Sequence, residues 1–175
     1  MARYRRVRVA GGTYFFTVCL VDRGSGLLVE RIGDLRAAYT ATVRERPVRC
    51  RAMVVLPDHL HAVWTLPEGD DDYATRWMLL KRRFSYAVGA GARSDSKRRK
   101  REKGVWQRRY WEHVVRDEAD LERCVRYVWE NPVRHGYVER PEDWPFVSVR
   151  QGGHHHAHRM WVVMRRCVGL GRLFG

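Results

Sequence analysis

The sequence contains no apolar run that approaches the roughly 20 residues of a membrane-spanning helix, so we expect no such helix. Near its start, arginine, glycine and threonine interrupt residues 7–20, which argues against a signal peptide. The 4 cysteines are scattered and form no CxxC pair, a pattern that argues against both disulfides and a zinc knuckle. Together these absences predict a reduced, cytoplasmic protein.

Acidic residues are also scarce, because 20 Asp and Glu stand against 34 Lys and Arg, which gives a net charge of +14. Hydrophobic residues nevertheless make up 45% of the 175 residues, a fraction typical of a folded protein with one core. An ordinary core with a large positive excess indicates a polyanionic partner, and nucleic acid is the commonest of these. The alternative at this point is a basic surface with no specific ligand.

The positive charge is not spread evenly along the chain. Arginines without acidic neighbours open the sequence, residues 93–103 are rich in Lys and Arg, and residues 144–175 contain arginines but no carboxylate. We therefore expect a single domain over residues 1–150, interrupted by a mobile basic loop at 89–104. A basic, His-rich tail follows over residues 151–175.

Hydrophobic periodicity predicts alternating strands and helices. β-branched and aromatic content predicts strands at residues 13–20, 49–56, 59–66 and 111–116. Apolar residues at helical spacing predict helices at residues 32–46, at 73–88, and from an Asp117 cap to about Asn131. The last helix is expected to end there because Pro132 disfavours helical geometry in the residue before it. This order fits an α+β fold with helices on one face of an antiparallel sheet, close to a ferredoxin-like arrangement.

Two histidines lie two residues apart on the strand predicted at 59–66. Because side chains alternate along a strand, His59 and His61 should point to one face while Leu60 points into the core. Two imidazoles on one face of a rigid strand can chelate a divalent cation. The alternative is a pair of histidines that merely share a solvent-facing surface.

Tyr127 and Asn131 are four residues apart on the last predicted helix, so they should lie on one face of it. The amide oxygen of Asn131 can serve as a hard metal ligand, and the phenol of Tyr127 can attack a phosphorus atom whose oxygens a metal polarises. In the alternative interpretation, the tyrosine packs against the core and the asparagine caps the helix end.

Several motifs agree in order and spacing with one family. VVLPDHLH is followed by WQRRYWEH, then by RYVWENPVRHGYV and DWPFVS. This pattern, over most of the chain from Tyr4 to Ser148, resembles the single-tyrosine HUH transposases, and most of all the REP-associated tyrosine transposases. The resemblance implies a ferredoxin-like nuclease domain that cuts and rejoins single-stranded DNA at hairpins of repetitive extragenic palindromes. It also implies a partner DNA hairpin and, by analogy, a monomer, with a homodimer as the alternative.

Carried over residue by residue, the resemblance makes His59, His61 and Asn131 the ligands of a Mg²⁺ or Mn²⁺ ion. It makes Tyr127 the nucleophile that forms a 5′-phosphotyrosine link, while the group that accepts its proton stays open. Basic and aromatic residues are expected to hold the DNA: Arg5, Arg6, Arg8, Lys81, Arg82, Arg108, Arg109, Trp111 and Arg126. For Trp111, a place in the core is an equal alternative.

Two other functions remain open on the sequence alone. The same fold could bind hairpin DNA or RNA without catalysis. A histidine-based hydrolase that attacks with metal-bound water would need a carboxylate near the site. Asp58 and Glu130 are the nearest in sequence, and we expect both to point away from the histidine face.

Overall fold

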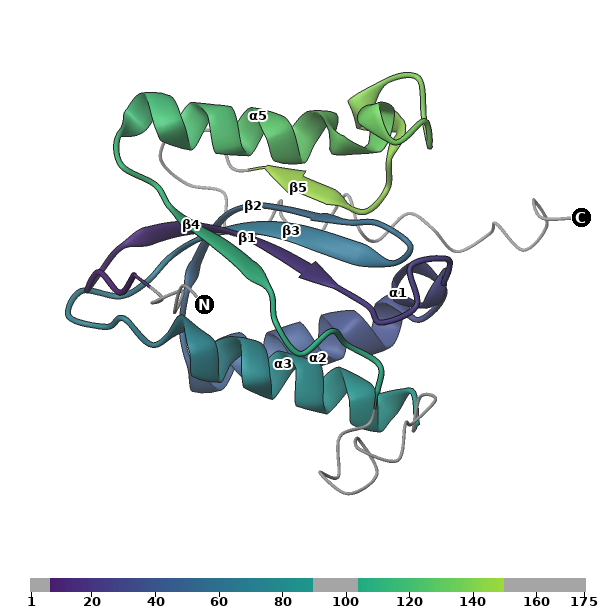
Figure 1. Cartoon of the computed structure of the whole chain (residues 1–175), viewed down its shortest axis with the longest axis horizontal. Helices are drawn as coiled ribbons and strands as arrows, with labels where there is room; N and C mark the ends of the chain where they lie inside the picture. Colours follow the sequence, from purple (N-terminus) through teal and green to yellow (C-terminus); the bar gives the residue numbers. More distant parts are fainter. Residues whose placement is uncertain (1–6, 90–103, 150–175) are drawn as a thin grey trace, which may run out of the picture.

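The computed structural model describes residues 7–89 and 104–149 (Figure 1). In chain order its elements are β1 (Thr13–Cys19), α1 (Leu27–Glu30), α2 (Ile32–Glu45), β2 (Arg49–Val55), β3 (His59–Thr65), α3 (Tyr73–Ala87), β4 (Trp111–Val114), α5 (Glu118–Arg134), η1 (Pro141–Asp143) and β5 (Val147–Val149). Most of the predicted basic loop, the tail, Arg5 and Arg6 lie outside the described residues. None of the helices within the described residues is long and apolar enough to cross a membrane.

The strands form one five-stranded antiparallel sheet in the order β4-β1-β3-β2-β5. β2 and β3 form a hairpin around Pro57 and Asp58, and β3 then pairs along its full length with β1, from Thr13 opposite Thr65 to Cys19 opposite His59. This α+β architecture with an antiparallel sheet is the one the sequence predicts. The histidine strand β3 lies at the centre of the sheet.

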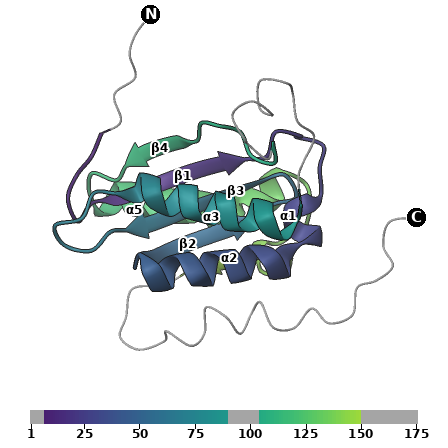
Figure 2. The same ribbon diagram turned by 90° about the horizontal axis from the view of Figure 1, so that it is seen from below.

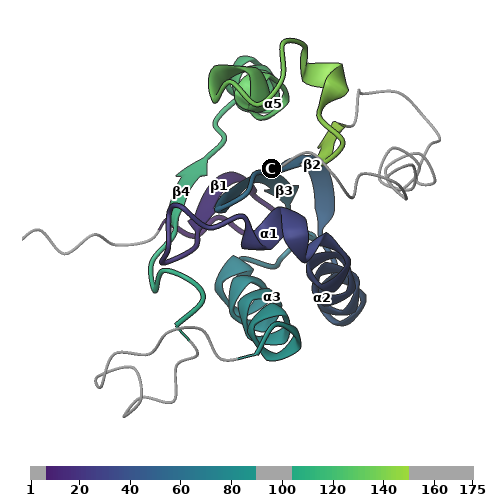
Figure 3. The same cartoon turned by 90° about the vertical axis from the view of Figure 1, so that its right-hand side faces the viewer.

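Helices cover both faces of this sheet, which corrects the expectation of helices on one face. α2 and α3 lie side by side beneath it (Figure 2), and α5 lies on the opposite face (Figures 1 and 3). Phe16 packs into the core on the α2–α3 side, whereas its neighbour Phe15 packs with Val128 under α5. The central strands are therefore buried on both faces, and β3 is buried from His59 to Trp64. A second apolar face needs its own covering layer.

α5 extends further than predicted. It begins at the expected cap, where the Asp117 carboxylate accepts a hydrogen bond from the Asp120 N–H at 2.8 Å. It then runs through Pro132 to Arg134 instead of ending near Asn131. Pro132 removes only its own N–H from the helix. Asn131 and Pro132 are both buried against the sheet, so packing outweighs the preference of the residue before a proline for extended geometry.

The short elements α1, η1 and β5 were not predicted, since runs of four or three residues carry no periodic pattern. β5 is held in place by the indole of Trp144, which donates to the carbonyl of Val55 at 2.9 Å. Within the described part of the chain, Cys19 and Cys124 are free thiols.

Candidate active site

The two strand histidines lie beneath α5, side by side on one face of β3. Their rings are 5.1 Å apart between centroids and nearly perpendicular, at 86°. His59 is 4% exposed and His61 3%, so a shared solvent-facing surface is excluded. Leu60 points the other way into the core with α2 and α3, as the alternation predicts.

Each histidine is oriented by a hydrogen bond at its Nδ1 atom. His59 Nδ1 donates to Oδ1 of Asp58 at 2.6 Å, and Asp58 Oδ2 is paired with the Arg23 guanidinium at 3.0 Å. His61 Nδ1 is bonded to the hydroxyl of Thr17 at 2.9 Å. The Nε2 atom of both rings is thereby left for a ligand, the arrangement that metal-binding histidines use.

Asp58 therefore does not point away from the histidines, contrary to our expectation. It lies in the turn before β3, where strand alternation does not apply, and its carboxylate turns back onto His59. Glu130 does have another partner, because its carboxylate accepts a hydrogen bond from Arg134 at 3.1 Å. Both carboxylates thus already have side-chain partners, Asp58 with His59 and Arg23, and Glu130 with Arg134.

Burial keeps both imidazoles neutral. It lowers the pKa of His61 to about 3, with the neighbouring His59 and His135 adding to the effect. Burial also lowers the pKa of His59, although the Asp58 carboxylate opposes that change. A neutral imidazole keeps the lone pair that a metal ion requires, so both rings are ready to coordinate at neutral pH.

Asn131 lies on α5 between Tyr127 and His135, whose rings contact His61 and His59, so it offers a third polar group on this face. It is 1% exposed, and neither its amide oxygen nor its amide nitrogen has a hydrogen-bond partner. His61 Nε2 is likewise buried without a partner. Buried polar atoms are rarely left unpaired, and two imidazole nitrogens with one amide oxygen suit a divalent cation. The residues present therefore fit the metal ion that the sequence predicts.

Tyr127 lies one helical turn before Asn131, at the edge of this buried group. Its ring contacts those of His61 and Phe15, at centroid distances of 5.2 and 5.6 Å, and 36% of the residue is exposed. The phenol is thus neither buried in the core nor remote from the histidines. Its half-open position lets a bulky substrate approach while the ring is held by edge-to-face contacts.

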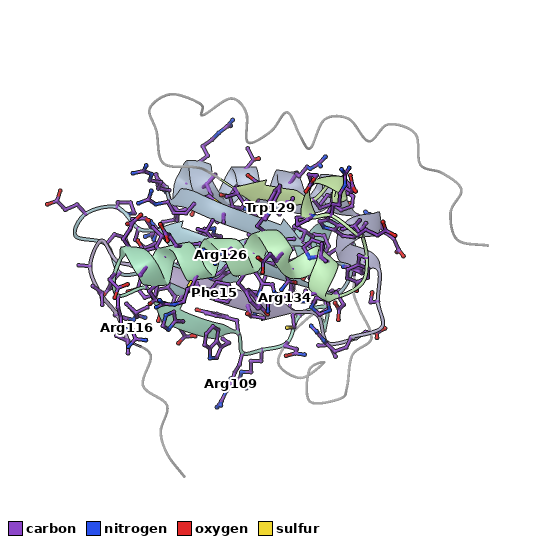
Figure 4. The ribbon with its side chains drawn as sticks, turned by 90° about the horizontal axis from the view of Figure 1, so that it is seen from above. Phe15, Arg109, Arg116, Arg126, Trp129 and Arg134 are labelled. Atoms are coloured by element: carbon purple, nitrogen blue, oxygen red, sulfur yellow. The ribbon has the colours of Figure 1, made fainter. Side chains whose placement is uncertain are left out.

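Arg134 is a neighbour of Tyr127 that the sequence analysis missed. Its guanidinium carbon lies 5.4 Å from the centroid of the tyrosine ring, a cation–π contact. Figure 4 shows Arg134 and Phe15 on one flank of α5, and Trp129 on the other. The spacing of seven residues from Tyr127 was the available signal, since it places both side chains on one helix face.

A hollow of about 360 Å³ lies next to the histidines at the β4 edge of the sheet. It is lined by Thr17, Cys19, Gln107, Arg109, Tyr110 and Trp111. Trp111 is 55% exposed, which settles its position outside the core. Because Thr17 lines the hollow and is also the hydrogen-bond partner of His61, one side chain separates the hollow from this candidate metal ligand.

The other predicted DNA-binding residues are scattered. Arg108 and Arg126 are exposed, on the segment before β4 and on α5. Lys81 and Arg82 are on α3, on the other side of the sheet from Tyr127, and Lys81 donates to the carbonyl of Gln107 at 3.0 Å. Arg8 pairs with Asp71 at 3.4 Å. The structure therefore places Arg109 and Trp111 in the lining of the hollow beside the site. Lys81 reaches the same hollow from α3, through its contacts with Gln107 and Tyr110.

A second group with metal-binding atoms comprises His113, Asp120 and Cys124, whose ligand atoms lie within 4.8 Å of one another. The carboxylate of Asp120 already has protein partners, because it accepts hydrogen bonds from His113 at 2.8 Å and from the Arg116 N–H at 3.1 Å. These bonds lower the pKa of Asp120 to about 2. Burial raises the pKa of the Cys124 thiol to about 11, which keeps it protonated. We interpret this group as a clasp between β4 and α5.

No family model matches the chain, but individual proteins do. It is 44% identical over 151 residues to the REP-associated tyrosine transposase of Escherichia coli K12, covering 86% of this chain and 84% of that protein. A Haemophilus influenzae relative of the same type is 45% identical over 153 residues, covering 86% of this chain and 87% of its own length.

A solved structure also matches, that of a REP-associated tyrosine transposase bound to a REP hairpin. It has a TM-score of 0.75 and 44% sequence identity, and the match covers 84% of this chain and 82% of that one. Identity at this level over most of both sequences identifies a common family. The chain belongs to the REP-associated tyrosine transposases.

Proposed function

We propose that this protein is a metal-dependent single-stranded DNA endonuclease and strand transferase. It cleaves and rejoins DNA at repetitive palindromic hairpins through a 5′-phosphotyrosine intermediate. The observation that carries the proposal is the contact between Tyr127 and His61, whose rings lie 5.2 Å apart while His61 Nε2 is buried without a partner. The REP hairpin in the related structure supports the choice of DNA.

His59, His61 and Asn131 would hold the cation, Mg²⁺ or Mn²⁺. When bound, the ion supplies Lewis-acid polarisation of a phosphoryl oxygen. The contribution of the protein is the rigid placement of the ligands, because Asp58 and Thr17 fix the two imidazole rings and α5 fixes the amide. Because these ligand side chains are already oriented, the reaction requires no free energy to rearrange them.

Tyr127 performs the covalent step. Its phenolic oxygen attacks the phosphorus, a P–O bond to tyrosine forms, and the P–O3′ bond of the DNA breaks. The electron pair leaves with the 3′ oxygen, which takes up a proton, while the tyrosine proton passes to solvent or a nearby base. Arg134 beside the ring offsets the negative charge that develops on the oxygen. The reverse reaction with another 3′-hydroxyl reseals the strand without a nucleotide cofactor.

The hollow at the β4 edge offers a path for the unpaired strand. Trp111 gives an exposed ring on which a base can stack, and Arg109 gives a cation for the adjacent phosphate. Arg108, on the segment before β4, and Arg126, on α5, are exposed and add positive charge. The salt dependence of binding should follow from such contacts, since each neutralised phosphate releases counterions.

A denaturing gel tests the reaction. The protein is mixed with a labelled hairpin oligonucleotide with single-stranded flanks, in Mg²⁺ or Mn²⁺. We expect a covalent protein–DNA adduct that disappears in Tyr127→Phe. Cleavage that persists in this variant without an adduct would point to attack by metal-bound water instead. DNA that is bound but never cut by the wild-type protein would point to a binding module without catalysis.

A further inference from the structure

We propose that His135 and Tyr137 form a second nucleobase-binding surface, on the side of the histidine pair away from Trp111. The proposal rests on the proposed function, because it assumes that a single DNA strand crosses the site. A series of ring contacts shows where this surface lies relative to Trp111. Phe15 links Trp111 to His61, and His135 lies against His59 at a centroid distance of 5.1 Å.

The local backbone holds these rings in place. Gly136 adopts a φ of +70°, a conformation that favours glycine, and it ends α5 with two hydrogen bonds. The Gly136 N–H donates to Val133 at 2.9 Å, and the Tyr137 N–H donates to Pro132 at 3.0 Å. This is the Schellman pattern, which turns the chain back across the end of the helix. Tyr137 is therefore directed by the helix terminus and does not depend on a flexible loop.

The rings form a partly open stack. Tyr137 lies 5.9 Å from His135 at an interplanar angle of 20°, and 5.2 Å from Trp144 at 28°. Such centroid separations belong to offset stacks, in which each ring covers only part of its neighbour. Tyr137 is 42% exposed and His135 is also exposed, so aromatic surface remains open to solvent. Trp144, in contrast, is anchored to Val55 and serves as the base of the stack.

Charges beside the stack favour a nucleic acid over a peptide aromatic as its occupant. Burial raises the pKa of the Tyr137 phenol, the Asp58 carboxylate adds to that rise, and the Arg23 guanidinium paired with Asp58 opposes it, so both members of this ion pair lie within electrostatic reach of the ring. The Arg23 side chain is 46% exposed, and that of Arg134, one residue before His135, is 57% exposed. Exposed rings next to guanidinium groups are the usual combination for binding single strands.

A binding experiment without catalysis tests the inference. All variants carry Tyr127→Phe and are assayed in EDTA by fluorescence anisotropy, with a hairpin oligonucleotide that has single-stranded flanks. Loss of one stacked base weakens binding by roughly 5- to 100-fold, and we expect a change in this range for Tyr137→Ala. Tyr137→Phe should keep wild-type affinity because it keeps the ring. Tyr86→Ala, an exposed tyrosine on α3, is the matched control and should bind normally.

Two further measurements keep the test decisive. Tyr137→Leu preserves apolar packing against Trp144, so a variant with normal thermal stability and weak binding separates stacking from folding. Substituting abasic nucleotides one at a time along the flanks should reveal one position at which Tyr137→Ala has no additional effect. Equal affinities of Tyr137→Ala, Tyr137→Leu and the parent protein would overturn the inference.

The adduct assay shows which of the two proposals fails. An adduct formed by wild-type protein, together with unchanged binding by Tyr137→Ala, refutes the second base-binding surface alone. Absence of any adduct, together with weakened binding by Tyr137→Ala, refutes the covalent mechanism and leaves the base-binding surface standing. If the affinity losses are equal at every abasic position, the ring has a structural effect and does not bind a particular base.

Discussion

Asp58 and His59 are adjacent in sequence and hydrogen-bonded side chain to side chain, at 2.6 Å between Oδ1 and Nδ1. Asp58 is in turn paired with Arg23. This short relay fixes the orientation of one candidate metal ligand from outside the site. It also keeps the Nδ1 proton on the ring, so the lone pair of His59 lies on Nε2.

Asp58→Asn should therefore weaken metal binding. We expect Mn²⁺ affinity to fall by roughly 10- to 100-fold, the usual cost of losing a carboxylate that supports a ligating histidine. Titration calorimetry with Mn²⁺ measures this directly. Asp34→Asn, at an ion-paired carboxylate on α2, is the control and should leave affinity unchanged. Equal affinity in the two variants would show that the Asp58 contact does not support the metal ligand.

Removal of a histidine should separate cleavage from binding. In His61→Ala we expect adduct formation to fall by roughly a hundredfold or more, because a metal ligand is lost. Salt-sensitive DNA binding should change little, since it depends on arginines elsewhere. Asp34→Asn, at an ion-paired carboxylate on α2, serves as the comparison and should cleave normally. Parallel loss of binding and cleavage in His61→Ala would contradict this separation of roles.

Arg134→Gln tests the cation beside the nucleophile. The rate of adduct formation in single-turnover experiments at saturating DNA should fall by roughly 10- to 100-fold, because charge on the phenolic oxygen loses its neighbour. Affinity for the hairpin should change far less. Arg126→Gln changes an exposed arginine on the same helix and should leave the single-turnover rate intact. Equal rates in the two variants would assign Arg134 a role in packing only.

Trp111 should contribute through its ring. We expect Trp111→Ala to lose roughly 5- to 100-fold in affinity for the single-stranded flank, and Trp111→Phe to retain most of it. A salt series distinguishes the two kinds of contact. Trp111→Ala should keep the slope of log affinity against log salt, whereas Arg109→Gln should reduce it by about one counterion. A reduced slope in Trp111→Ala would argue against a stacking contact.

Asp120 links acid stability to the clasp between β4 and α5. Its pKa of about 2 lies below the ordinary value of 3.8, so the folded state favours the ionised form. The stabilisation is complete above pH 4 and disappears as the pH falls through about 2. Asp120→Asn should lower the free energy of unfolding by about 1–2 kcal/mol at neutral pH. Urea unfolding at a series of pH values should show this difference shrinking towards pH 2, and a constant difference would refute the linkage.

The sequence predicts much of the fold because its patterns are regular. A period of two places His59 and His61 opposite Leu60, and a period of 3.6 places Tyr127 with Asn131. Neither pattern says that the helix lies over the histidine face. That relation came only from the family resemblance, since the face that a helix covers depends on packing between distant segments.

The missed contacts share a physical reason. Asp58 lies in a turn and Tyr137 follows a left-handed glycine, so neither side chain obeys a strand or helix period. Pro132 suggested a helix end, but burial of its neighbours kept the helix intact. Arg134 lies seven residues after Tyr127, on the same helix face, but the spacing alone does not show that its guanidinium packs on the tyrosine ring.

The candidate metal ligands lie on two separate elements, so metal binding depends on how these elements pack against each other. β3 carries the imidazoles, while one helix, α5, carries both the amide and the proposed nucleophile. An ion bound between them would brace the helix against the sheet, and loosening the helix would release the ion and withdraw the tyrosine together. By thermodynamic linkage, the free energy with which the docked helix improves metal affinity equals that with which the metal improves docking. Under the proposed mechanism, active-site assembly and tertiary stability would thus be a single equilibrium.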